Sequence, residues 1–136
     1  MLFSFMANMI IDIKKMGING EGIGYLNKKP VFVDGALAFE RVLIDQLKEF
    51  PTYYKANLKK VIQPSAHRVK PPCPIQYQCG ACSLMHASLK MQKEVKIDNL
   101  KQALHKYADI KNIRIDLVDN PKPMGYRNQF KFILGI

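Results

Sequence analysis

Cys73-Pro-Ile-Gln-Tyr-Gln-Cys79-Gly-Ala-Cys82 is the stretch around which this sequence is organised, and His86 follows it closely. It contains all three cysteines of the chain. Thiolates are soft, anionic ligands, and several of them in one short loop can hold an iron–sulfur cluster or a zinc ion. Pro72 and Pro74 stiffen the backbone beside the first cysteine, and Gly80 permits a sharp turn between the other two. The stretch therefore predicts a metal centre rather than three scattered core residues.

The composition limits what can surround this stretch. The chain has 136 residues, of which 48% are hydrophobic and 24% charged, as is typical of folded domains. Its formal net charge of +10 favours a polyanionic partner such as nucleic acid. An odd number of cysteines argues against a disulfide framework and suits a reducing compartment, and no apolar run is long enough to span a bilayer. We therefore expect a cytoplasmic monomer without a membrane partner.

Residues 9–66 are predicted to form a β domain, preceded by an N-terminal extension at 1–8. The expected strands are 9–14, 22–26, 30–34, 40–48 and 53–62. Five short strands without intervening helices predict a mainly β fold, namely a closed five-stranded barrel of the OB type. Gly20, Gly22 and Gly24 lack the third glycine of a nucleotide-binding loop, and a strand rather than a helix follows them, so they indicate a tight bend at a corner of the barrel.

Basic and aromatic residues alternate along this predicted barrel. Barrels that bind nucleic acid combine a positive groove for phosphates with aromatic faces for stacked bases. The alternative is that the aromatic side chains fill the barrel while the lysines are ordinary surface residues. We favour RNA binding, and the predicted RNA-binding residues are Lys28, Lys29, Arg41, Lys55, Lys59, Arg68 and Arg127.

Residues 67–110 are predicted to form the metal loop and a helix that covers it. The Pro-rich segment 63–74 indicates an extended linker into the loop. Ser88 is a suitable N-cap for a helix that runs to about Tyr107. The face expected to pack over the loop consists of Leu89, Ile97, Leu100, Leu104 and Tyr107.

Residues 111–136 are predicted to begin a truncated α+β central domain. The segments 113–118 and 125–134 have the alternation of β-strands, with a Pro-containing turn between them. An apolar strand without a following partner favours the interpretation that the chain is a fragment.

The order of these features resembles the N-terminal third of the 23S ribosomal RNA uracil-5-methyltransferases. The resemblance rests on the small barrel, on Pro64-Ser-Ala-His-Arg-Val-Lys-Pro-Pro-Cys73-Pro, on Cys79-Gly-Ala-Cys82, on His86 and on Gly125-Tyr-Arg-Asn128. In that family an OB-type TRAM barrel precedes a 4Fe–4S loop, a central domain and a Rossmann-like domain that binds S-adenosylmethionine.

The resemblance implies that Cys73, Cys79 and Cys82 are three of four cluster ligands, the fourth cysteine coming from further along the parent chain. It also implies 23S rRNA as the partner. The S-adenosylmethionine site, the catalytic cysteine and the carboxylate base would lie in the remaining methyltransferase domains, so no catalytic residue is expected among these 136 residues. The expected role of this segment is to bind RNA and to hold a structural 4Fe–4S cluster.

Two alternatives to this interpretation remain open. Cys73, Cys79, Cys82 and His86 could instead form a tetrahedral Cys3His zinc site in an RNA-binding module without enzymatic activity. A redox or sulfur-transfer protein could use a three-cysteine cluster with one open iron position, although no acid–base residues of a substrate pocket are evident.

Overall fold

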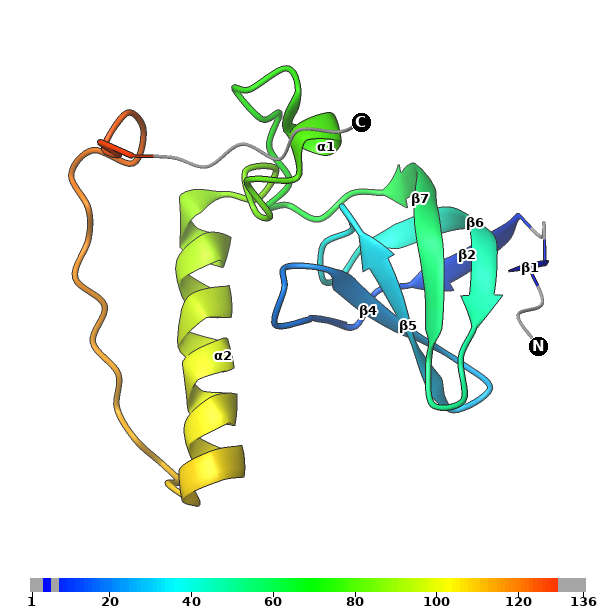
Figure 1. The fold of residues 1–136 in the computed structure, drawn as a ribbon, viewed down its shortest axis with the longest axis horizontal. Coiled ribbons are helices and arrows are strands. Elements are labelled where there is room, and N and C mark those ends of the chain that lie inside the picture. The colour runs from blue at the N-terminus through cyan, green and yellow to red at the C-terminus, as the bar shows by residue number, and fades with distance from the viewer. Residues whose placement is uncertain (1–3, 6–7, 130–136) are drawn as a thin grey trace.

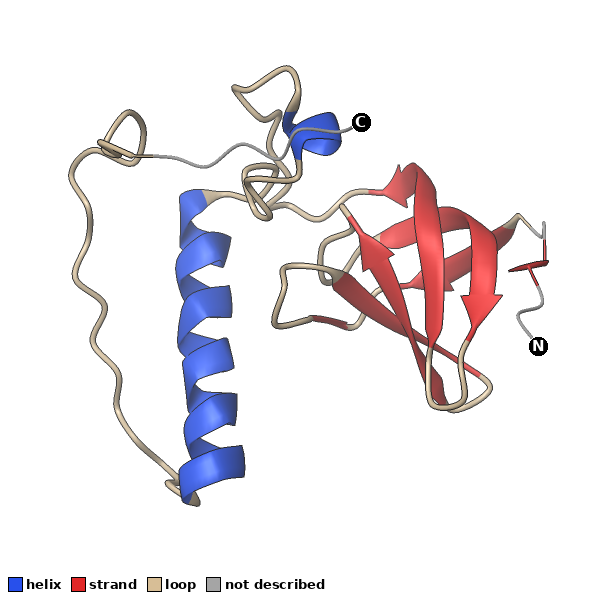
Figure 2. Cartoon of the chain, in the orientation of Figure 1, coloured by secondary structure: helices blue, strands red, loops and turns tan. Residues whose placement is uncertain are grey.

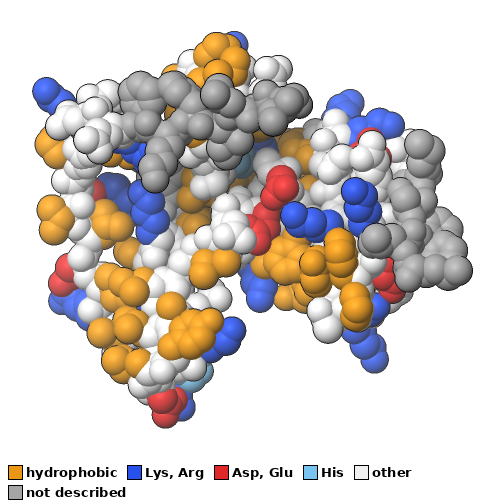
Figure 3. Space-filling view, in the orientation of Figure 1, with side chains coloured by type: hydrophobic (Ala, Val, Ile, Leu, Met, Phe, Trp, Pro, Cys, Tyr) orange, Lys and Arg blue, Asp and Glu red, His pale blue; other side chains and the backbone are white. Residues whose placement is uncertain are grey.

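The computed structural model describes residues 4–5 and 8–129 as a curved β-sheet, a loop that carries the cysteines and one long helix (Figure 1). The strands are β1 (Ser4–Phe5), β2 (Met9–Asp12), β3 (Lys15–Met16), β4 (Gly22–Leu26), β5 (Lys29–Asp34), β6 (Arg41–Glu49) and β7 (Tyr54–Gln63). The helices are α1 (Gln76–Cys79), a single turn within the cysteine loop, and α2 (Leu89–Ala108). The sheet and α2 lie side by side, as Figure 2 shows, and a notch separates them in the space-filling view (Figure 3).

The described strands form one mixed sheet. Six of them follow the order β1-β6-β7-β5-β4-β3, and β2 pairs separately with β6. The β5–β7 pair is parallel, whereas the other described pairs are antiparallel. The prediction of a mainly β fold is confirmed, and all five predicted strands are present with bounds that differ by at most two residues. The short strands β1 and β3 were not predicted.

The prediction of a closed barrel is wrong. The path of paired strands ends at β1 and β3, and no ladder joins these two strands in the described ranges. The strand predicted for 9–14 ends at Asp12 as β2, which pairs with β6, and the unpredicted β3 follows it and pairs with β4. Ile13 lies between them, and its N–H donates to the carbonyl of Glu40 at 2.8 Å instead of to a strand. This interruption leaves the sheet open although it curves strongly around its core.

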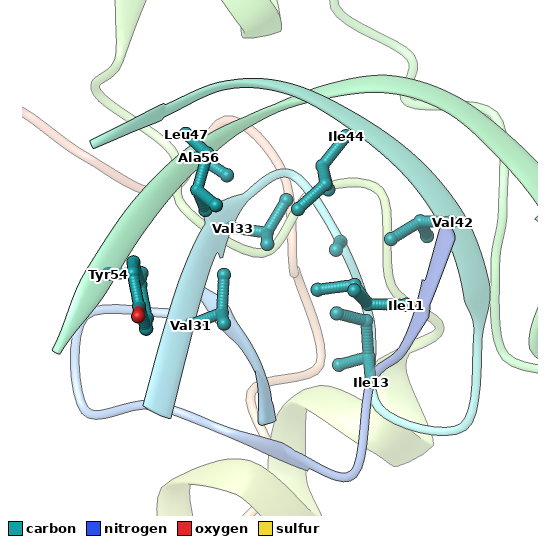
Figure 4. Packing of buried hydrophobic residues seen from close by; sticks show 10 residues of the cluster. Ile11, Ile13, Val31, Val33, Val42, Ile44, Leu47, Tyr54 and Ala56 are labelled. Atoms are coloured by element: carbon teal, nitrogen blue, oxygen red, sulfur yellow. The ribbon is translucent and has the colours of Figure 1, made fainter. Parts of the chain in front are cut away.

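The concave side of the sheet holds the main hydrophobic core (Figure 4). Its buried members are Ile11, Ile13, Val31, Val33, Ala36, Val42, Ile44, Leu47, Tyr54 and Ala56.

A bulge in β6 completes this inward face. The register shifts between Asp45 and Lys48, where Gln46 has a φ of 48°, and Leu47 is buried as a result. Strict alternation from Ile44 would have placed Leu47 on the outer face.

Glycine is required where β4 approaches other parts of the backbone. A Cβ atom at Gly24 would lie 2.9 Å from the carbonyl oxygen of Asp12, and one at Gly22 would lie 2.9 Å from Ala36 Cβ. Real Cβ atoms essentially never show such contacts, so these two glycines have a structural role, which is close packing within the sheet and not the predicted bend at a barrel corner.

The helix α2 begins where the sequence predicts, but it packs through a different face. Ser88 Oγ accepts a hydrogen bond from the Met91 N–H at 3.3 Å, which caps the helix. The cluster beneath α2 consists of Leu37, Ala38, Ala87, Met91 and Val95, with Met16 and Leu84 at its edge. On the predicted face, by contrast, Leu100 is 47% exposed and Tyr107 is 79% exposed. Apolar side chains occupy two faces of α2, and the fold buries the face that meets Leu37.

The segment after α2 differs from the prediction. The strand predicted for 113–118 is absent, because these residues have no regular secondary structure. In the second predicted strand, 125–134, the first five residues also have none, and 130–134 lie outside the described residues. An extended segment becomes a strand only when a neighbouring strand takes up its backbone hydrogen bonds, and none is present for 113–118 in the described ranges. No helix in the same ranges has the combination of length and apolarity needed to cross a membrane.

The observed orientation of α2 predicts a large difference between two substitutions in that helix. Met91→Ala should lower the free energy of unfolding by about 2–3 kcal/mol, because Met91 is 5% exposed and packs against the sheet. Leu100→Ala should change it by less than about 0.5 kcal/mol, because this side chain is half exposed. Urea unfolding followed by circular dichroism measures both values. A larger loss of stability for Leu100→Ala than for Met91→Ala would instead show that α2 packs through the face predicted from the sequence.

Candidate functional site

The cysteine loop is closed at its base by antiparallel pairing between segments 67–69 and 86–88, which together we call the neck. Backbone hydrogen bonds of 2.9 and 2.8 Å flank an isolated bridge at its centre. His67 adds a side-chain contact, since its Nδ1 lies 3.0 Å from Ser88 Oγ at the N-cap of α2. The predicted extended linker is therefore a paired segment that fixes both ends of the loop to the start of α2.

The three thiols are free, and they lie within the loop that the neck closes. Cys73 and Cys79 are half-buried, and Cys82 is exposed. The N–H of Cys79 donates to the Ile75 carbonyl at 2.9 Å, and Gly80 then turns the chain with a φ of 68°. In the described part of the chain, no three His, Cys, Asp or Glu side chains are grouped closely enough to hold a metal ion. The loop thus supplies suitable donors, but its described conformation does not gather them around one centre.

A buried ion pair joins the neck to the sheet. Arg68 Nε and Nη2 donate to the two carboxylate oxygens of Glu40 at 2.6 and 2.8 Å, and Nη2 also donates to the Gly35 carbonyl at 2.6 Å. The N–H groups of Leu37 and Ser65 donate to the same carboxylate at 2.8 and 3.2 Å. Burial alone would raise the pKa of Glu40, but the hydrogen bonds from Arg68 and from the two N–H groups outweigh it and leave this pKa lowered. Glu40 is therefore ionised and held by several donors.

A second buried pair connects the cysteine turn to the neck. Gln76 Nε2 lies 3.0 Å from His86 Nδ1 and donates to the Cys82 carbonyl at 3.3 Å. Burial, reinforced by the charge of Arg68, lowers the pKa of His86 to about 4, so the imidazole is neutral at pH 7. Its Nε2 atom is buried and has no hydrogen-bond partner within the described residues. His86 thus has one nitrogen engaged by Gln76 and one nitrogen free.

The loop also touches the sheet directly. A Cβ atom at Gly20, where φ is +88°, would lie 3.0 Å from Ser83 Cβ, so the turn before β4 packs closely against the segment that follows the cysteines. The Tyr77 ring of α1 lies 6.1 Å from the His86 ring, measured between centroids. The sheet, the neck and the cysteine loop therefore form one continuous packed unit.

Four of the seven basic residues predicted to bind RNA are held by partners inside the chain. The partners are Glu49 for Lys29, Asp12 for Arg41, Asn8 for Lys59 and Glu40 for Arg68, at 2.8, 3.1, 3.0 and 2.6 Å. Arg68 is the most buried of the four, and its pair with Glu40 gives it a structural role, while its predicted RNA contact stays a prediction. Lys28, Lys55 and Arg127 have exposed side chains without a carboxylate partner in the described ranges.

Lys55 lies within a surface that combines positive charge with aromatic rings. It is the cross-strand neighbour of Phe32 on one side and of Lys48 on the other. Tyr53 packs edge-on against Phe32 with centroids 5.5 Å apart, and it stacks on Phe50 at 4.5 Å. Like charges directly across a sheet repel each other, so Lys48 and Lys55 together favour an anion between or above them. These five residues form what we call the basic–aromatic face.

Three residues of the site, Glu40, Gln76 and Lys48, were not predicted from the sequence. Glu40 carried a usable signal, because a single carboxylate directly follows the apolar run 36–39 and is unlike a surface residue. Lys48 carried none, since only the register of β6 against β7 places it beside Lys55.

Comparison with known proteins relates the chain to RNA methyltransferases. No family model matches it. It is 37% identical over 125 residues to an uncharacterized RNA methyltransferase of Listeria innocua, and 40% identical over 127 and 129 residues to uncharacterized RNA methyltransferases of Enterococcus faecalis and Bacillus cereus. These alignments cover 90%, 91% and 92% of this chain but only 27%, 28% and 28% of the relatives. The chain thus spans little more than a quarter of their length.

The stability of the fold at acid pH tests the ion pair. The folded-state pKa of Glu40 lies below its ordinary value of 4.5, so the pair stabilises the fold fully above that pH and loses its effect as the pH falls through the folded-state pKa. Glu40→Gln should lower the free energy of unfolding at pH 7 by about 3 kcal/mol, because it leaves Arg68 buried without its partner. It should also flatten the loss of stability that occurs as the pH falls below 4.5. Urea unfolding at several pH values measures both effects.

Glu49→Gln is the matched control. Its carboxylate pairs with Lys29 at 2.8 Å but is exposed, so its removal should change the stability at pH 7 far less. Equal decreases in the free energy of unfolding for Glu40→Gln and Glu49→Gln would contradict the larger stabilisation assigned to the buried pair.

Proposed function

We propose that the chain is the RNA-binding and cluster-holding N-terminal part of an S-adenosylmethionine-dependent 23S rRNA uracil-5-methyltransferase. The observation that carries this proposal is the similarity of about nine-tenths of the chain to proteins named RNA methyltransferases. The segment would contribute recognition and not catalysis, and the methyl transfer would be performed by the rest of the protein. Its curved sheet would then be the TRAM domain that the sequence resemblance implies.

The RNA contact is proposed at the basic–aromatic face. Lys48 and Lys55 lie next to each other without a carboxylate partner in the described ranges, and phosphate oxygens would relieve their mutual repulsion. Phe32 and Tyr53 are half-buried, so part of each ring is accessible to a base or a sugar. The net charge of +10 would attract RNA over the whole surface, while this face would position it.

A 4Fe–4S cluster is proposed as the occupant of the cysteine loop. Cys73, Cys79 and Cys82 would be its ligands, together with a fourth group from elsewhere in the parent protein. Soft thiolates are the usual ligands of such clusters, and all three thiols are free. A bound cluster would cross-link the loop above the neck, which makes a structural role more natural than a catalytic one.

Zinc is the second candidate, and the state of His86 favours it. A neutral imidazole with an unpartnered buried Nε2 has the chemistry of a zinc ligand. In this case the three cysteines and His86 would complete the site within the chain, and the protein would be an RNA-binding module.

Metal analysis of the purified chain separates these two proposals. Purification without oxygen, with a small thiol present to take the place of the fourth ligand, should yield brown protein that contains iron and sulfide in equal amounts, and Cys73→Ser, Cys79→Ser or Cys82→Ser should each remove them. His86→Gln should retain the iron, since His86 is not a ligand in the cluster proposal. Colourless protein with one zinc ion, lost in His86→Gln, would replace the cluster proposal with the zinc proposal.

The salt dependence of RNA binding tests the basic–aromatic face. Lys48→Gln and Lys55→Gln should each weaken binding to single-stranded RNA at low salt and reduce the slope of log affinity against log salt by about 1. Lys101→Gln removes the same charge from an exposed position on α2 and serves as the control. Fluorescence anisotropy with labelled RNA measures the slopes. Equal slopes for all four proteins would exclude this face as the RNA contact.

A further inference from the structure

A groove of about 150 Å³ lies between the sheet and α2. One wall is formed by the segment 14–16 and by Ala38 and Phe39, and the other by α2. Its apolar floor includes Met91 and Val95 of the hydrophobic cluster beneath α2, together with Met16, which packs against that cluster. The space-filling view shows the corresponding notch between the two parts of the molecule, with hydrophobic side chains on both sides of it (Figure 3).

Phe39, on the rim of this groove, is exposed and strained. The side chain is 80% exposed, although a phenylalanine gains stability when it is buried. Its φ of 67° lies in the left-handed region, which is unfavourable for a side chain of this size. The N–H of Phe39 donates to the Ile13 carbonyl at 2.8 Å, so the surrounding fold imposes this conformation. Strain of this kind is concentrated at binding sites, because the structure holds a side chain where a ligand needs it.

The walls of the groove carry unpaired charges of opposite sign. Lys15 is exposed on the sheet side, and Glu94 and Asp98 are exposed on α2. None of these three forms an ion pair within the described residues. Asn99 adds a side-chain amide beside the two carboxylates. A ligand that presents a flat ring, hydrogen-bond donors and a negative charge would match all of these groups at once.

We propose that this groove binds a single unpaired RNA base that carries an exocyclic amino group, such as cytosine. The base stacks on Phe39, its amino group donates to Glu94 or Asp98, and its phosphate lies at Lys15. The proposal rests on the proposed RNA-binding function and adds a base-selective subsite to it. Lys14 continues the positive rim, although it also lies 3.8 Å from Asp12.

The size and the charges of the groove favour a base over other occupants. Sites for complete small molecules usually measure roughly 300–1,000 Å³, so this smaller, open groove suits one ring of a longer chain. A second copy of this chain has the same net charge of +10 and would be repelled. RNA supplies both the ring and the opposite charge.

Binding of short RNAs by the full 136-residue chain tests the proposal. The probes are labelled oligocytidine and oligouridine of about 12 nucleotides, within the range of site sizes known for OB-type folds. They carry equal charge, so a difference between them reports on base recognition. The wild-type chain should bind oligocytidine at least about 5-fold more tightly than oligouridine. Asp98→Ala combined with Glu94→Ala should remove this preference, because both acceptors for the amino group are then absent.

Phe39 variants separate stacking from folding. Phe39→Ala should weaken the binding of oligocytidine by about 5- to 100-fold, the range for the loss of one stacked base. Phe39→Gly should weaken it equally while the midpoint of thermal unfolding stays the same or rises, because glycine relieves the left-handed conformation. Tyr107→Ala, which removes a ring of nearly the same exposure outside the groove, should leave the affinity unchanged.

The outcomes distinguish the subsite from the wider function. If the wild-type chain binds both RNAs in a salt-dependent way but the Phe39 variants bind as tightly as it does, the subsite is wrong and the RNA-binding function stands. If the wild-type chain binds neither RNA, both proposals are wrong. Reduced thermal stability of Phe39→Gly together with normal affinity would assign Phe39 to the fold and overturn the subsite.

Discussion

The buried pair of Arg68 and Glu40 is the constraint on which the arrangement of this molecule depends. Glu40 lies between β5 and β6, and Arg68 belongs to the neck, so their two hydrogen bonds of 2.6 and 2.8 Å join the sheet to the base of the cysteine loop. A carboxylate in this position needs a partner, because an ionised group without one is strongly unfavourable in an apolar environment. The sheet therefore cannot bury Glu40 favourably unless the neck is in place.

The geometry of this pair explains why the joint is specific. The planar guanidinium of Arg68 meets both carboxylate oxygens and has a further donor for the Gly35 carbonyl, which the single ammonium group of a lysine could not reproduce. Two backbone N–H groups complete the environment of the carboxylate. Such a fully satisfied set of donors and acceptors fixes one orientation of the neck. Apolar contacts alone would leave that orientation less well defined.

The sequence predicted features that depend on neighbouring residues better than features that depend on distant ones. The positions of the five predicted strands and the N-cap at Ser88 follow from local alternation and from local hydrogen bonding, and strands lie at these positions although their total number differs. The barrel closure and the buried face of α2 depend on which segments meet in space, and both predictions were wrong. Arg68 shows the same limit at the site, because the sequence reveals its charge but not the carboxylate 28 residues away that engages it. The metal ligands and the RNA contacts stay predictions.

The neck also relates the cysteine loop to the groove beside α2. Ser88 belongs to the neck and caps α2, and Met91 lies within the next turn of the helix and forms part of the groove floor. The position of α2 relative to the sheet is therefore set at its start by the neck and further along by the packing of Met91 and Val95. Because Arg68 of the neck is fixed to Glu40 and Gly35 of the sheet, the neck and the sheet hold the start of α2 in one place. The distance across the groove between α2 and Phe39 is therefore set by the ion pair at one end and by apolar packing along the helix.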